Sequence, residues 1–268
     1  MKIIDLSSWN SIDIKQALHD FNGVILRVGY RGYSNGKIVQ DKKFSKYLSQ
    51  VLESGKPWGI YFVTQAINPQ ESEQEAQFCI DALKNVNKAK LCLGIWHDHE
   101  NGNGGRGRGD SISVNVRKAN ANAFCAYLNK AGYKAGVYAS ESWATRYFTD
   151  CKYPLWIAKY SKNKPKYTCV MWQYTSSGKV TGCNGRVDFS ECYFLENDDV
   201  KPITTKPVVG DIPSLKGYKG FSIVNGLKSF GYESSFAYRK QLAERLGIVN
   251  YKGTAKQNLT LLSILKTR

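Results

Sequence analysis

The sequence predicts an α/β protein built on a parallel barrel of eight strands, followed by a small, mainly helical domain. Eight short apolar runs are spread over the first 190 residues, and helical patterns follow the first five of them. Alternation of strands and helices favours a parallel sheet that closes into a barrel. A flavodoxin-like open sheet also alternates, but it usually needs fewer strands.

The expected strands are short runs of apolar residues bounded by turn residues. They span residues 3–5, 24–30, 58–64, 91–96, 135–139, 155–159, 169–174 and 186–189. Only turns separate the last three runs. We therefore expect five strand–helix units, followed by three strands without helices.

The first two expected helices show apolar residues at helical spacing. These residues are Ile14, Ala17, Leu18 and Phe21 in the first helix, and Phe44, Tyr47, Leu48, Val51 and Leu52 in the second. The third begins near Asn68, with Pro69 and Glu71 in its first turn, where proline and acids are favoured. The fourth is expected over residues 112–131 and a shorter fifth over residues 140–148.

The character of the sequence changes after residue 195. Residues 196–212 carry acids, two prolines and small polar residues, which indicates a linker between a domain over residues 1–195 and another over residues 213–268. The last segment has helical stripes and few strand signals. From Lys201 onward it holds 12 Lys and Arg against 3 Asp and Glu, so it is strongly basic.

Composition narrows the choice of partner. The formal net charge of +16 predicts attraction to a polyanion, such as nucleic acid, anionic lipid or an acidic wall polymer. The chain also has 17 Tyr and 6 Trp, whose flat faces and polar edges suit stacking on sugar rings. Core packing is the simpler explanation for any single ring.

Seven cysteines, an odd number without a paired C-x-x-C motif, support neither a disulfide framework nor a zinc site. Cys79 and Cys125 fit apolar helical patterns, so we expect them to be buried thiols in a protein that folds in a reducing compartment. We identify no signal peptide at the N-terminus and no apolar run long enough to cross a membrane.

Four carboxylates are the main candidates for chemistry. Asp5, Asp98, Glu100 and Asp188 close three of the expected strands, and the ends of barrel strands meet at the rim where catalytic groups sit. Crowded carboxylates raise one another's pKa, so one can stay protonated while another is ionised. Glycoside cleavage needs this pair of states. A solvated loop acid or a metal ligand is the alternative for each.

His97 and His99 flank Asp98, and a glycine-rich segment follows Glu100. By strand alternation the histidines should face away from the acids, so we expect structural roles and no metal or other cofactor. The segment 102–107 formally matches G-x-G-x-x-G, but the helix begins too late for a phosphate loop. We expect a mobile loop beside the site.

Residues 1–193 resemble glycoside hydrolase family 25, the Chalaropsis-type lysozymes and phage endolysins. The motifs that carry the resemblance are Ile4-Asp5-Leu6-Ser7-Ser8-Trp9-Asn10, Gly59-Ile60-Tyr61-Phe62, Asp98-His99-Glu100, Gly136-Val137-Tyr138, Leu155-Trp156-Ile157-Ala158, Met171-Trp172-Gln173-Tyr174 and Val187-Asp188. Their order follows the family along the whole region. The resemblance implies a TIM-like (β/α)5(β)3 barrel that cleaves the bond between N-acetylmuramic acid and N-acetylglucosamine.

The resemblance also implies roles for individual residues. Glu100 corresponds to the general acid and Asp98 to its partner carboxylate, while Asp5 and Asp188 complete an acidic floor. Four aromatic residues of the same motifs are assigned to substrate binding: Tyr61, Trp172, Tyr138 and Trp9. His97 and His99 depart from the family pattern, where we expect more apolar neighbours of the acidic pair.

Residues 218–268 resemble the C-terminal wall-binding modules of Bacillus phage amidases and clostridial endolysins. The shared residues include Ser234-Ser235-Phe236, Arg239 and the segment Tyr251–Asn258. Together the two resemblances imply a phage endolysin that is made in the host cytoplasm without a signal peptide, is released to the wall, and acts as an antimicrobial. Its expected partners are peptidoglycan and anionic wall polymers, without nucleic acid and without membrane insertion.

Three alternatives stay open from the sequence. The barrel could bind wall carbohydrate without catalysis, although all four acids are present. The charge and the single Arg106-Gly107-Arg108-Gly109 segment could serve nucleic acid, but one such segment is far short of a repeat tract. The C-terminal segment could also join copies of the chain into a homo-oligomer.

Overall fold

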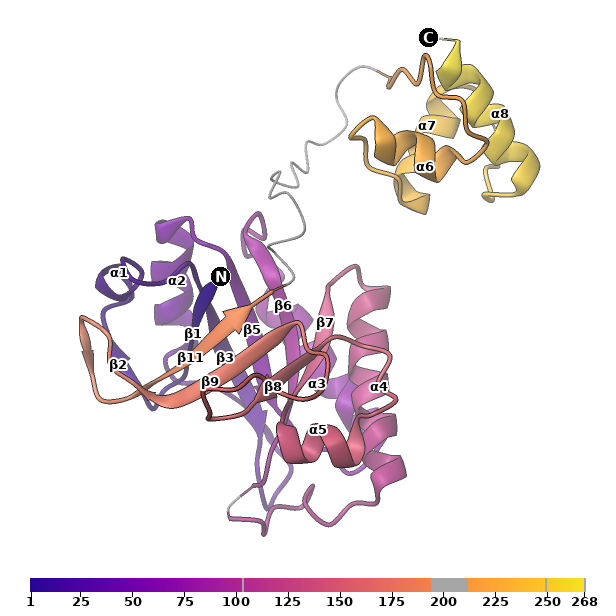
Figure 1. The fold of residues 1–268 in the computed structure, drawn as a ribbon. Coiled ribbons are helices and arrows are strands. Elements are labelled where there is room, and N and C mark those ends of the chain that lie inside the picture. Colours follow the sequence, from indigo (N-terminus) through magenta and orange to yellow (C-terminus); the bar gives the residue numbers. More distant parts are fainter. Residues whose placement is uncertain (103, 194–211, 249, 268) are drawn as a thin grey trace. The chain divides into compact units, whose positions relative to one another are not determined.

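Eight strands of the N-terminal unit close into a barrel (Figure 1). The barrel strands are β1 (Lys2–Leu6), β3 (Gly23–Arg31), β5 (Trp58–Val63), β6 (Leu91–His99), β7 (Ala135–Ser140), β8 (Leu155–Ala158), β9 (Met171–Gly178) and β11 (Val187–Cys192). Strand β1 closes the sheet because it pairs with both β3 and β11. Neighbouring strands are parallel except that β11 runs antiparallel to β1 and β9.

Five helices follow the first five barrel strands and lie outside them (Figure 1). They are α1 (Ile14–Ala17), α2 (Phe44–Ser54), α3 (Pro69–Ala82), α4 (Val114–Lys130) and α5 (Glu141–Tyr147). Helix α3 begins as expected, with Asn68 accepting a hydrogen bond from the Glu71 N–H and Pro69 in the first turn. The predicted arrangement of five strand–helix units and three further strands is confirmed.

Three short strands are additions to the predicted pattern. Strand β4 (Ile38–Gln40) pairs antiparallel with the end of β3, and β2 (Ser11–Ile12) pairs with β10 (Cys183–Asn184). With two or three residues each, these strands are too short to give a periodic sequence signal. They lengthen the connections that follow β1 and β3 and the connection that precedes β11.

Alternate residues of the barrel strands belong to two separate apolar cores. One core lies between the strands and the helices and includes Ile4, Leu26 and Phe62, with the buried thiols of Cys79 and Cys125. The other core fills the barrel, with members Ile3, Ile25, Leu93, Trp96, Tyr138, Trp156, Ala158, Met171 and Cys192. Because strand side chains alternate, residues two positions after Ile3, Ile25 and Trp96 also face the interior.

Strand β3 contains a register shift against β5. Arg27 lies opposite Tyr61, but Gly29 lies opposite Phe62, so two steps along β3 match one step along β5. Such a bulge reverses the alternation of side chains beyond it. Arg27 therefore faces the interior of the barrel, whereas Arg31, four residues later, faces the helices.

The C-terminal unit forms a small helical domain. Its helices are α6 (Ile223–Ser229), α7 (Phe236–Arg245) and α8 (Ala255–Lys266), and they share a core that includes Leu227, Leu242 and Leu261. The chain divides into two compact units, Met1–Thr204 and Thr205–Arg268. The structure describes residues 1–102, 104–193, 212–248 and 250–267, so the expected linker over 196–212 lies outside them except for Ile212.

Among these described residues, no helix is both long and apolar enough to cross a membrane.

The packing of Gly136 generates a stability prediction. A Cβ atom placed on this residue of β7 would lie 2.5 Å from the Trp96 ring and 2.7 Å from the Pro154 carbonyl oxygen. Gly136→Ala should therefore cost about 1–3 kcal/mol, as overpacking of a core does, and urea unfolding should show it. The cost should be smaller in a Trp96→Leu background, where the ring is gone. An unchanged urea midpoint would contradict the close contact.

Candidate active site

Asp5 and Asp188 meet at one rim of the barrel. They lie opposite each other in the antiparallel pair of β1 and β11. Asp188 was expected to end its strand, but it is the second residue of β11. It reaches the rim because β11 runs in the opposite direction to the other strands. Burial raises the pKa of Asp5 well above its usual value, and the neighbouring Asp188 charge raises it further.

Asp98 and Glu100 come to the same rim from β6. This strand was expected to end at Trp96, but it continues to His99, because β5 and β7 pair with it on both sides as far as Asp98 and His99. Asp98 is buried, and Glu100, the next residue after the strand, is exposed to solvent. Two positions after Trp96, Asp98 faces the barrel interior as alternation predicts.

The two carboxylates of β6 share a crowded electrostatic environment. Burial raises the pKa of Asp98 well above its usual value, and the Glu100 and Asp5 charges add to the rise. The surrounding groups partly desolvate the Glu100 carboxylate and raise its pKa, although the residue is open to solvent, and the Arg27 charge opposes this rise. Because close carboxylates resist joint ionisation, the pair retains a proton at higher pH than an isolated acid would.

Arg27 is the cation whose charge lowers the pKa of Asp98 and Glu100, and sequence reasoning missed it. Its Nε donates to Asp41 Oδ2 at 2.7 Å and its Nη2 donates to Ser8 Oγ at 2.9 Å, so the guanidinium is held in place. Its place in the expected strand could have identified it. Arg27 lies two residues after the inward-facing Ile25, and a charged side chain inside a barrel needs a charged or hydrogen-bonding partner.

The four aromatic residues assigned to substrate binding differ in accessibility. Trp9 is 87% exposed in the loop after β1, and Tyr61 is half-buried with its ring edge-on to Trp156. Trp172 and Tyr138 are 5% and 9% exposed, so they offer little surface for stacking. Their roles in binding stay predictions. Tyr160, which sequence reasoning missed, is 59% exposed just after β8.

His97 and His99 face the helices. His97 Nε2 lies 2.8 Å from Glu75 Oε2 of α3, and His99 Nε2 lies 2.9 Å from His97 Nδ1. The His97 ring also stacks on Phe124 with centroids 4.0 Å apart. Burial lowers the pKa of both histidines well below the usual value, so both rings are neutral. Among the described residues, no group of three or more His, Cys, Asp or Glu could hold a metal ion.

Glu75 joins this histidine pair to a cation. Arg31 Nε donates to Glu75 Oε1 at 2.7 Å, and the Thr64 hydroxyl donates to Oε2 at 2.7 Å. Burial raises the pKa of Glu75 to about 7, although Arg31 opposes the rise. The network ties β3, β6 and α3 together directly behind Asp98.

Described residues of the glycine-rich segment after Glu100 make side-chain hydrogen bonds, and the mobility expected of this loop stays a prediction. Asp110 accepts hydrogen bonds from the backbone N–H groups of Gly102 and Gly107. Arg108 makes two bonds to the Glu71 carboxylate, at 2.6 and 3.0 Å. The sequence pattern predicts the glycine-rich loop but not the pairing of Arg108 with Glu71, which lies 37 residues earlier in the chain.

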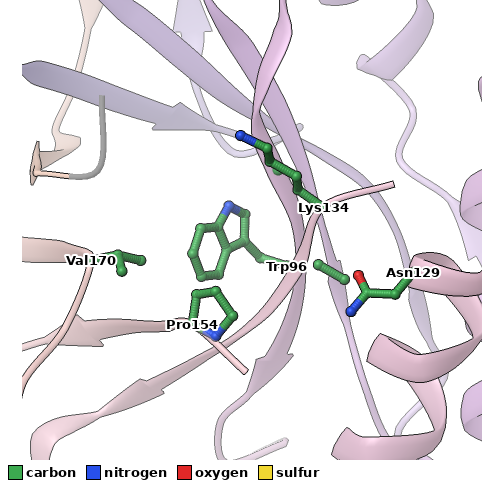
Figure 2. Close-up of a pocket in the computed structure, with 7 residues that line it drawn as sticks. Trp96, Asn129, Lys134, Pro154 and Val170 are labelled. Atoms are coloured by element: carbon green, nitrogen blue, oxygen red, sulfur yellow. The ribbon is translucent and has the colours of Figure 1, made fainter. Parts of the chain in front are cut away.

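A cavity of about 340 Å³ opens at the other end of the barrel. Its lining includes Lys134, Pro154 and Val170, which directly precede β7, β8 and β9. Figure 2 shows the Trp96 indole at the centre, with Pro154 below it, Val170 to its left and Asn129 of α4 to its right. None of the four acids lines this cavity, so it is separate from the acidic rim.

Comparison with known protein families gives one matching family model. The family model for glycosyl hydrolases family 25 matches residues 4–183. The comparison with curated proteins gives no match.

Three solved structures illustrate the similarity. The modular autolysin LytC from Streptococcus pneumoniae, solved in complex with a synthetic peptidoglycan ligand, is 28% identical with a TM-score of 0.59. The match covers 70% of this chain but 46% of the autolysin, so the chain spans less than half of that protein's length. The CTP1L endolysin is 25% identical over 74% of this chain and 71% of its own, with a TM-score of 0.57.

The lysozyme from Streptomyces coelicolor shares the fold, with a TM-score of 0.61 at 19% identity. The match covers 72% of this chain and 91% of that one.

The network behind the acids generates a second stability prediction. Arg31→Met leaves the buried Glu75 carboxylate without its cation, which should cost about 3–5 kcal/mol. With the cation gone, Glu75 binds its proton still more tightly when folded than when unfolded. Protonation at about pH 5 should therefore relieve part of the cost seen at about pH 8.

Urea unfolding at both values measures this difference. Lys118→Met is the control, because Lys118 pairs with Asp150 on the exposed surface and should have little effect. Equal destabilisation at both pH values would contradict the role of the Glu75 charge.

Proposed function

The chain belongs to the glycosyl hydrolases of family 25, and from this premise we propose that it is a peptidoglycan hydrolase of the lysozyme type. It cleaves the bond between N-acetylmuramic acid and N-acetylglucosamine. The observation that carries the proposal is the meeting of Asp5, Asp98, Glu100 and Asp188 at one rim, with raised pKa values and with Glu100 open to solvent.

Glu100 is the proposed general acid. Its raised pKa keeps a proton available closer to neutral pH, and its exposure lets the proton be replaced from solvent. Transfer of this proton to the glycosidic oxygen breaks the bond to the leaving sugar. Asp98, which is deeper in the barrel, then faces the positive charge that develops on the sugar ring.

Asp98 has a free oxygen for this task. Its Oδ1 atom is buried and accepts no hydrogen bond from the described residues. The N-acetyl group of muramic acid carries an N–H that can donate a hydrogen bond to such an oxygen. We therefore hypothesise that Asp98 orients the acetamido group for substrate-assisted attack, a known departure from the two-carboxylate scheme.

The C-terminal unit is proposed to hold the enzyme on the bacterial wall. Its side chains support this, because Phe221 is 85% exposed and Phe236 is 48% exposed. Arg239 lies over the Phe236 ring and is anchored by Tyr251 and Asn258. Aromatic faces and cations together suit an anionic wall glycopolymer. This targeting fits an endolysin released from the cell in which it is made.

The role of Glu100 predicts the effect of its amide variant. Glu100→Gln cannot donate the proton, so the rate of wall digestion should fall about 10²- to 10⁴-fold, the usual contribution of a general acid. Release of new reducing ends from purified peptidoglycan measures the rate and identifies the bond. Glu73→Gln, at an exposed position of α3, is the control and should keep full activity. Near-normal digestion by folded Glu100→Gln would refute the assignment.

The hypothesis for Asp98 makes a distinct chemical prediction. If the acetamido group is the nucleophile, no sugar becomes covalently attached to the protein. Mass spectrometry of the enzyme quenched during turnover should then show only the unmodified chain. A sugar attached to Asp98 would make Asp98 the nucleophile, and inversion of anomeric configuration would exclude both routes.

The division of labour between the units predicts how a truncated chain behaves. A chain of residues 1–198 should digest soluble wall fragments at the normal rate but clear intact cells more slowly, because tethering no longer raises its local concentration. Residues 208–268 should bind walls without cutting them, and part of that binding should weaken with salt. Failure of this segment to bind any susceptible wall would favour a role in self-association.

A further inference from the structure

Gln173 of β9 sits at the centre of a buried hydrogen-bond network that the proposed reaction does not yet explain. Its Nε2 donates to Asp5 Oδ2 at 3.0 Å. Its Oε1 accepts from the Tyr138 hydroxyl at 2.8 Å and from the Tyr160 hydroxyl at 3.0 Å. Gln173 is 2% exposed, so water cannot replace these partners freely.

The two phenols determine which way the amide points. With both hydroxyls donating to Oε1, the NH₂ group is directed at Asp5, and Asp5 Oδ2 must act as an acceptor. The reverse orientation would place two acceptors against each other unless Asp5 carried a proton on Oδ2. The orientation of Gln173 and the protonation of Asp5 are therefore linked.

Asp5 is surrounded by groups that influence its charge. The titratable groups that face it are Asp188 of β11, Asp98 and Glu100 at the end of β6, Tyr61 of β5, Tyr138 of β7 and Tyr160 after β8. Burial, Asp188 and Glu100 favour the protonated acid, whereas the hydrogen bond from Gln173 favours the ionised one. Gln173 is the neutral group that opposes the acids.

We propose that Gln173 is a positioning residue that fixes Asp5 Oδ2 as an acceptor and thereby controls whether Asp5, which lies opposite Asp188, carries a proton. The amide acts through Asp5 and not on the substrate. Its consequence for turnover rests on the proposed hydrolase function, but its effect on Asp5 does not. Through its two hydrogen bonds, Gln173 also connects Asp5 on β1 with the exposed residue Tyr160.

The test replaces the donor with an acceptor of the same shape. In Gln173→Glu, one carboxylate oxygen still accepts from both phenols, but the other faces Asp5 Oδ2, so a proton is needed between them. Carboxyl ¹³C NMR titration of the folded protein should show the pKa of Asp5 raised by about one unit or more. The acidic limb of the wall-digestion pH profile should move to higher pH by a similar amount.

A second glutamine offers a matched control. Gln77 of α3 also accepts from a tyrosine hydroxyl, that of Tyr127, and donates to a carboxylate, that of Asp81. Gln77→Glu makes the same chemical change away from the site and should shift neither Asp5 nor the pH profile. Tyr160→Phe removes one of the two donors and should give a smaller shift in the direction of Gln173→Glu.

The two measurements separate the inference from the function on which it rests. An unchanged pKa of Asp5 in folded Gln173→Glu would overturn the inference, whatever the enzyme does. A shifted pKa with no wall digestion by the unaltered protein would uphold the link to Asp5 and refute the hydrolase. Should Gln173→Glu fail to fold, Gln173→Met supplies the same titration, because it removes the donor without adding a charge.

Discussion

The insertion of β11 between β1 and β9 is the contact on which both the barrel and its acidic rim depend. Strand β11 runs antiparallel to both neighbours, so its first residues reach the rim where the other strands end. This direction places Asp188 opposite Asp5. A parallel strand in the same place would bring Asp188 to the opposite end of the barrel. The pairing of this strand thus closes the sheet, and its direction decides which residues make up the site.

Buried polar groups on the two faces of β6 differ in how completely they are hydrogen-bonded. On the helix side, Glu75 has partners on both carboxylate oxygens, from Arg31, Thr64 and His97. On the barrel side, Asp98 keeps one buried oxygen that accepts no hydrogen bond from any described residue. A satisfied network is rigid, whereas an unsatisfied buried acceptor costs free energy that a ligand can recover. The rigid face therefore holds the strand, while the other face keeps an acceptor oxygen that a ligand can use.

The sequence was sufficient for the barrel because hydrophobic periodicity marks each of its eight strands. It was less successful where polar residues continue a strand. The apolar run in β6 predicts an end of this strand at Trp96, because His97 and Asp98 are polar, but the neighbouring strand β5 pairs with both of them. Alternation still placed Asp98 and His97 on opposite faces. Arg27 and Gln173 were missed for another reason, since their hydrogen-bond partners lie on other segments of the chain, Ser8 and Asp41 for Arg27 and Asp5 for Gln173.

The register shift in β3 has a wider consequence. Without it, Arg27 and Arg31 would point to the same side, and two cations would compete within one interior. With it, one strand places a positive charge in each of two compartments, one lined by the four rim acids and one between strand and helix. Substitutions in the outer compartment can then alter the strength of the scaffold without changing the charge balance of the inner one. A single additional residue in one strand thus partly separates the residues that set the stability of the barrel from those that set the charge of its interior.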